Sequence, residues 1–295
     1  MTEFSGLPSV QALAWALVHF LWQGTLIAIA AALLMRAAAR ASTRYAIGIG
    51  ALVLMVAAPA VTFLMQLESS TTPVFESAVA SFAGETNRAA SLTVSSSAAG
   101  NAAGFDPGWW PALGVFAWIA GMLVLSVRLA GGWLVARRMA TRAVRPAADH
   151  VQAVARRLAE RLALGRAVEV LESSAVAVPV LVGWLRPAVV FPVAALAGLS
   201  PVQIEALLAH ELAHVRRHDY LVNLLQSFAE IVLFYHPAVW WLSRRVRTER
   251  ELCCDDLAVG LCDRLVYATA LTDLAAMRSP RVALARRLLL GLWGS

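Results

Sequence analysis

The sequence predicts a mainly α-helical membrane protein in which three N-terminal transmembrane helices precede an α+β domain. Of the 295 residues, 59% are hydrophobic and only 15% are charged, which is too apolar for an ordinary soluble domain. Three long runs in the first half of the chain hold no charged residue. After about residue 146 these runs give way to amphipathic and alternating patterns. We therefore divide the chain into an N-terminal membrane region, residues 1–145, and a C-terminal domain, residues 146–295.

The first predicted span covers residues 12–35 and is long enough to cross a bilayer. A cleavable signal peptide is the alternative for this segment, but such a peptide needs a basic stretch before its apolar run. The only preceding charge is Glu3, so a retained span is favoured. Two further spans are predicted at 45–67 and at about 109–127, and Trp109 and Trp110 open the last one at the membrane interface.

Arginines set the predicted orientation of the spans, because basic residues concentrate on the cytoplasmic side. All 25 basic residues are arginine, and they cluster between the first two spans and after the third (Arg36, Arg40, Arg44, Arg128, Arg137, Arg138, Arg142, Arg145). The loop 68–108 holds four acidic residues against one arginine and is expected outside. The N-terminus is then outside and the C-terminal domain faces the cytoplasm of a bacterial inner or cell membrane. Topology accounts for the net charge of +6, so direct nucleic-acid binding is not expected.

The C-terminal domain opens with a predicted amphipathic helix at 149–165, whose apolar residues share one stripe (Val151, Val154, Ala155, Leu158, Leu162). Residues 168–173 and 175–192 are predicted strands, and the second segment folds back around 183–187. Ser200, Pro201 and Gln203 then supply an N-cap, a preferred first-turn residue and a capping-box partner. A helix is therefore predicted to begin at this point.

That helix contains the segment HELAH at 210–214. His210 and His214 are four residues apart, so their side chains leave one face of the helix and could share a zinc ion. Glu211, next to the first histidine, could act as the general base on water activated by that ion. The alternative is an accidental motif on a solvated helix. The capped start, the uncharged residues inside the motif and a second acidic cluster downstream weaken that alternative.

A catalytic zinc needs a third protein ligand and one open position. His218 lies two turns from His210 on the same helix, which is too far along the rise to join both histidines. The extended motif HExxHxxGxxH is absent, because Arg217 and Tyr220 stand at its Gly and His positions. His236 and Cys253 could bind a metal in principle.

Glu251 is the better candidate for the third ligand, because Asp255 follows four residues later on the same helical face. Asp255 would then hydrogen-bond the far nitrogen of a ligating histidine and fix its tautomer. A solvated face on which both acids pair with Arg247 and Arg250 is the alternative, and spacing alone leaves it open.

The apolar segment 229–242 is shorter than a span and is interrupted by Pro237. A full span is one interpretation, but a helix–turn–helix at the membrane face or packed on the zinc helix is favoured. A crossing segment would place Glu251 on the opposite side of the membrane from His210.

Several ordered segments resemble those of BlaR/MecR-type membrane metallopeptidases, the antirepressor group of the gluzincins. They are LLAHELAHVRRHD, Asn223, FYHPAVWW and RTERELCCDD, with VPVLVGWLRPAVVFP and HFLWQG upstream. The resemblance covers most of the chain and implies a gluzincin-type zinc metallopeptidase domain. It implies His210, His214 and Glu251 as zinc ligands, Glu211 as catalytic base and Asp255 as the residue that orients a ligand. It also implies that the upstream strands offer an edge for an extended substrate.

Sensor members of this group carry a fourth span and an outer penicillin-binding domain. This chain ends at Ser295, which indicates a truncated product or a short member. Because it contains no lysine, it lacks the Ser-x-x-Lys acylation motif, and direct β-lactam sensing is not expected.

The implied function is signal-dependent proteolysis of a cytosolic repressor or of the chain itself. The expected partners are a polypeptide substrate, which could be a winged-helix transcriptional repressor, membrane lipid, and a second copy of the chain in a homodimer. Membrane-protein quality control of the Ste24/HtpX type is an alternative function, and a non-catalytic signalling scaffold that has kept its zinc is another.

Overall fold

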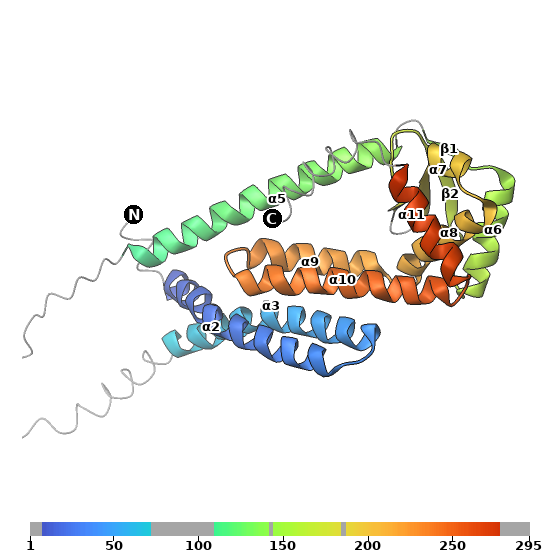
Figure 1. Cartoon of the computed structure of the whole chain (residues 1–295). Coiled ribbons are helices and arrows are strands. Elements are labelled where there is room, and N and C mark those ends of the chain that lie inside the picture. The colour runs from blue at the N-terminus through green and yellow to red at the C-terminus, as the bar shows by residue number, and fades with distance from the viewer. Residues whose placement is uncertain (1–7, 72–108, 142–143, 184–186, 278–295) are drawn as a thin grey trace, which may run out of the picture.

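The computed structural model describes residues 8–71, 109–141, 144–183 and 187–277. Its first part consists of three long helices, α2 (Pro8–Ala37), α3 (Ala41–Thr71) and α5 (Trp110–Thr141). All three are long and apolar enough to cross a membrane, which confirms the three predicted spans. Helices α2 and α3 lie side by side, and α5 runs as one rod from their end to the α+β region (Figure 1).

Helices α2 and α3 extend beyond the predicted spans at both ends, and α5 extends beyond its span at the C-terminal end. The α2–α3 connection is shorter than expected, so Arg36 and Arg44 lie within helices and not in a loop. Helix α5 continues past residue 127 to Thr141 and includes Arg128. An arginine inside a membrane helix is tolerated where it faces protein, and Arg128 lines one small cavity together with Glu230 and Trp240. The predicted loop 68–108 falls mostly outside the described residues.

A four-stranded sheet forms the base of the α+β region, in the order β1-β2-β4-β3. Its strands are β1 (Val144–Pro146), β2 (Glu169–Ser173), β3 (Val180–Val182) and β4 (Ala188–Pro192). Strands β3 and β4 pair antiparallel, as the folded-back segment predicts, and Gly183 at the start of the turn has φ 83°, a conformation that glycine adopts without strain. The parallel pairing of β2 with β4 and the short edge strand β1 were not predicted.

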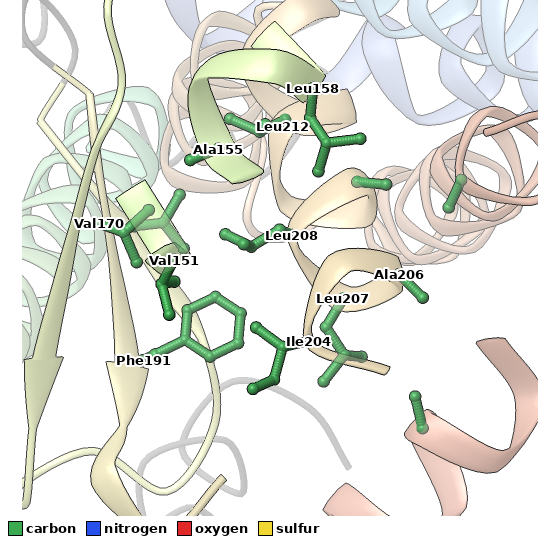
Figure 2. Packing of buried hydrophobic residues seen from close by; sticks show 14 of the residues in the cluster. Val151, Ala155, Leu158, Val170, Phe191, Ile204, Ala206, Leu207, Leu208 and Leu212 are labelled. Carbon is green, nitrogen blue, oxygen red and sulfur yellow. The ribbon is translucent and has the colours of Figure 1, made fainter. Parts of the chain in front are cut away.

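Helices α6 (Asp149–Arg161) and α8 (Pro201–Arg216) enclose the core of this region against the sheet (Figure 2). The predicted stripe of α6 is buried through Val151, Ala155 and Leu158. It meets Phe191 of β4 and Leu208 of α8, both fully buried. The short helix α7 (Val193–Gly198) leads from β4 into α8. Burial of this apolar face fixes which side of α8 points away from the sheet.

Two helices after α8 form a long antiparallel hairpin that packs along α2 and α3 (Figure 1). They are α9 (Asp219–Val232) and α10 (Pro237–Val259), joined by a turn at 233–236. A helix–turn–helix was expected, but this one is longer and reaches between the spans. Its turn bonds to the middle of α2, where Tyr235 Oη donates to Leu17 O at 3.0 Å and His236 Nε2 lies 3.0 Å from Leu21 O.

The hairpin also contacts α5 closely. Trp118 Nε1 donates to Val232 O at 2.8 Å. A Cβ atom at Gly121 would stand 2.2 Å from Phe234 Cζ, so this glycine permits the approach. Because the hairpin turns back, the start of α9 and the end of α10 both lie at the end of the hairpin that is next to α8. The last described helix, α11 (Arg264–Ala276), starts at the N-cap Asp263 and packs on α8.

Candidate metal centre

Helix α8 carries the HELAH segment and has a fixed start. Ser200 Oγ accepts from Gln203 N at 3.3 Å, and Gln203 Oε1 accepts from Ser200 N at 2.9 Å, which completes the predicted capping box. Leu208 and Leu212 face the sheet and are fully buried. The helix therefore turns His210 and His214 away from the core, toward α10 and α11.

His210, His214 and Glu251 converge on one point. Glu251 Oε2 lies 3.7 Å from Nε2 of His210 and 3.7 Å from Nε2 of His214. The three ligand atoms all lie within 4.8 Å of one another. Ligand atoms on one tetrahedral zinc at the usual bond lengths stand about 3.3 Å apart, so this set needs only a small contraction. Two imidazole nitrogens and one carboxylate are a ligand set that catalytic zinc sites use.

The Nδ1 atom of His210 contacts side chains of α10 and α11. His210 Nδ1 lies 3.1 Å from Asp255 Oδ1 and 2.8 Å from Tyr267 Oη of α11. Tyr267 also donates to Asp255 Oδ1 at 2.6 Å. Burial opposes protonation of His210, but its bonds to Asp255 and Glu251 outweigh burial and raise its pKa to about 9 in the metal-free site. Asp255 thus lies within hydrogen-bonding distance of the His210 nitrogen that faces away from Glu251.

The far nitrogen of His214 is held by the first residue of α9. Asp219 Oδ2 lies 2.7 Å from His214 Nδ1, and Asp219 is only 5% exposed. The thiol of Cys254 lies 3.3 Å from the same nitrogen and donates to Asp219 Oδ2 at 3.5 Å. These three residues also form a group with metal-binding spacing. Burial raises the pKa of Cys254, which disfavours the thiolate that a metal needs.

Two acids at the site differ in their electrostatics. Burial raises the pKa of Glu211, although the neighbouring histidines oppose the shift. Burial also opposes ionisation of Glu251, but its hydrogen bond to His210 and the charges of His214 and Arg250 outweigh burial and lower its pKa to about 2. Glu251 is thus available as an anionic ligand. Glu211 lies outside the ligand group and is suited to take up a proton.

The other residues weighed as ligands lie elsewhere. His236 caps α10 at the hairpin turn, where its Nδ1 accepts from Ala238 N at 3.1 Å, so it neither joins the site nor reaches a reacting group there. Cys253 is buried in the cluster between the hairpin and the spans. His218 was expected on the same helix as His210, but α8 ends at Arg216, and His218 is the N-cap of α9 with φ 55°.

Sequence patterns missed three side chains that support the site: Asp219, Tyr267 and Tyr45, whose hydroxyl bonds to Asp219. The closeness of Asp219 to His214 in the chain is the one signal that could have pointed to any of them.

The fold and this site define a class, membrane proteins with an HExxH helix and a metallopeptidase-type ligand group. The chain belongs to the BlaR1 peptidase M56 family, whose model matches residues 19–290. It is similar to Regulatory protein BlaR1 of Bacillus licheniformis, with 32% identity over 89 residues, 30% of this chain and 15% of that protein. It is also similar to the methicillin resistance mecR1 protein of Staphylococcus aureus (strain Mu50 / ATCC 700699), with 23% identity over 107 residues, 35% of this chain and 18% of that protein. The matches span less than a fifth of each relative's length.

Proposed function

We propose that this membrane protein is a zinc metalloendopeptidase, with His210, His214 and Glu251 as metal ligands. The convergence of their three ligand atoms within 4.8 Å carries the proposal. Zinc at this place would supply Lewis acidity, which activates water and withdraws charge from the attacked carbonyl group. The fit of two imidazoles and one carboxylate to that ion supports the choice of metal.

Glu211 takes the proton from the attacking water and passes it to the leaving amine. Asp255 and Asp219 each accept from the Nδ1 side of one histidine, which leaves both Nε2 lone pairs for the metal. No Ser or Cys nucleophile is needed. Strand β3 is an edge of the sheet, and an extended substrate would add to it as a further strand.

We propose that the peptidase acts in regulation, by cleaving a cytosolic repressor or its own chain. The similarity to a regulatory protein and to a methicillin resistance protein supports this role over quality control. The arginines in and beside the α2–α3 connection and at the end of α5 support a site that faces the cytoplasm.

Glu211→Gln tests the chemistry separately from metal binding. The amide cannot accept a proton, so hydrolysis should fall about a hundred- to ten-thousand-fold while zinc content and folding are kept. Casein-like substrate and self-cleavage during expression provide the two activity measurements. Equal activity in wild type and variant, with zinc in both, would contradict the mechanism. Zinc in both forms without cleavage by either is the result that a non-catalytic scaffold predicts.

A further inference from the structure

A chain of two hydrogen bonds joins the membrane helix α3 to the candidate ligand His214. Tyr45, in the second turn of α3, is 7% exposed, and its hydroxyl donates to Asp219 Oδ1 at 3.1 Å. The other oxygen of the same carboxylate lies 2.7 Å from His214 Nδ1. Each oxygen of Asp219 therefore has its own partner, one from the membrane region and one from the metal centre.

The guanidinium group of Arg217 lies beside both Tyr45 and Asp219. The guanidinium carbon of Arg217 lies 4.5 Å from the centre of the Tyr45 ring, and Arg217 Nε lies 3.7 Å from Asp219 Oδ1. A buried carboxylate without a cation nearby would be costly, so Arg217 stabilises Asp219 as an anion. An anionic Asp219 is a strong acceptor for both the tyrosine hydroxyl and the imidazole.

The residue before Tyr45 engages the other element that carries a ligand. Arg44 Nε donates at 2.8 Å to Glu249, which is fully buried on α10. Glu251 stands two residues later on that helix. Adjacent residues of α3 thus hold both the group behind His214 and the helix of Glu251.

We propose that Tyr45 is a positioning residue for His214, acting through Asp219, so that a membrane helix completes the metal centre. The inference rests on the proposed function, because it takes His214 as a ligand. With Oδ1 bonded to Tyr45, the carboxylate plane is fixed and Oδ2 stays on His214 Nδ1. That contact sets the imidazole tautomer and ring orientation that leave Nε2 for the metal.

Tyr45→Phe tests the role, because it keeps the ring under Arg217 and removes only the hydroxyl. In the full chain, loaded with zinc in detergent, we expect zinc affinity to weaken about two- to tenfold, the effect of one lost hydrogen bond. Competition with a chromophoric chelator measures it. The matched control is Tyr235→Phe, which removes the bond to Leu17 O at the opposite end of the hairpin. The control should leave zinc affinity unchanged, and equal affinity in Tyr45→Phe and wild type would overturn the inference.

A double-mutant cycle separates positioning from a general structural effect. If Tyr45 acts through Asp219, Tyr45→Phe should cause no further loss in an Asp219→Ala background. An equal loss in both backgrounds would overturn the route through Asp219. Should Asp219→Ala not fold, the comparison of Tyr45→Phe with Tyr235→Phe decides by itself. Wild type that binds no zinc would overturn the proposed function and this inference together, whereas unchanged zinc binding in Tyr45→Phe overturns the inference alone.

Discussion

His210 and His214 are neighbours on α8, yet different regions of the molecule hold them in place. Asp255 and Tyr267 hold His210, and both belong to the C-terminal helices α10 and α11. Asp219 holds His214, and Tyr45 of the membrane helix α3 holds Asp219. One half of the candidate site is therefore completed within the α+β region and the hairpin base. The other half depends on how the hairpin sits against the membrane helices.

The Tyr45–Asp219–His214 contacts show that the membrane region can be joined to the metal centre by direct hydrogen bonds as well as by chain connection. A flexible tether would leave the metal site unchanged whatever the membrane helices do. Here the junction consists of buried polar groups, whose geometry is more demanding than that of apolar packing. A change in the position of α3 would reach His214 through Tyr45 and Asp219, and would reach α10 through Arg44 and Glu249.

Glu251→Ala should have the largest effect on zinc binding, since it removes the proposed ligand that lies 3.7 Å from both histidines. Outer partners of metal ligands are typically worth 10–100-fold in metal affinity, and we expect loss of a ligand to exceed this range. Metal analysis of the purified protein provides the measurement. Asp256→Ala is the matched control, because this exposed acid lies on the same helix outside the ligand group. Full zinc occupancy in Glu251→Ala would show that the third ligand is another residue.

Asp219→Ala and Asp255→Ala compare the two halves directly. Both should weaken zinc binding within the range of about 10–100-fold. The loss should be larger for Asp219→Ala, because only the weakly bonding thiol of Cys254 remains near His214 Nδ1. In Asp255→Ala, Tyr267 remains 2.8 Å from His210 Nδ1. A larger loss in Asp255→Ala would contradict this ranking of the two supports.

Sequence patterns pointed to the candidate ligands but not to Tyr45, Asp219 and Tyr267, the residues that bond to the ligand side chains or to their partners. The pairing of His210 with His214 follows from helical spacing. Spacing left the roles of Glu251 and Asp255 open against a solvated face, and only the family resemblance implied them. Tyr45 and Asp219 are 174 residues apart in the chain, so no local pattern can pair them. Tyr267 likewise meets His210 only through the packing of α11 on α8.

Apolar composition predicted the three spans, but the helices run past the predicted bounds, and the reason is related. Composition locates a span because lipid contact demands uncharged side chains. Arg44 marked a loop in the sequence but bonds to buried Glu249 within a helix, and this partner was not visible in the local pattern. Charged residues are poor markers of helix ends wherever another part of the protein neutralises them.

The pH dependence of zinc binding should report on the His210 half. Its pKa is about 9 in the metal-free site, above the ordinary value of 6.5, so zinc must displace a proton at neutral pH. Affinity should therefore rise by up to about tenfold per pH unit toward pH 9 and level off above it. Chelator competition over this range measures the slope. Asp255→Ala should move the plateau to lower pH, whereas an affinity already flat above pH 7 would contradict the raised pKa.

The smallest effect is expected at the far end of the hairpin. A Cβ at Gly121 would meet Phe234 at 2.2 Å, whereas one at Gly114 on the same helix would meet nothing within 4 Å. The ring of Phe234 must shift to admit this Cβ, and we expect Gly121→Ala to cost about 1 kcal/mol, the low end of overpacking penalties. Gly114→Ala should be close to neutral in the same thermal unfolding measurement. Zinc affinity should change in neither variant, because the turn at Phe234 and the bond between Tyr45 and Asp219 lie at opposite ends of the hairpin. A loss of zinc affinity in Gly121→Ala would show that the seat of the whole hairpin, and not the start of α3 alone, controls the His214 half of the site.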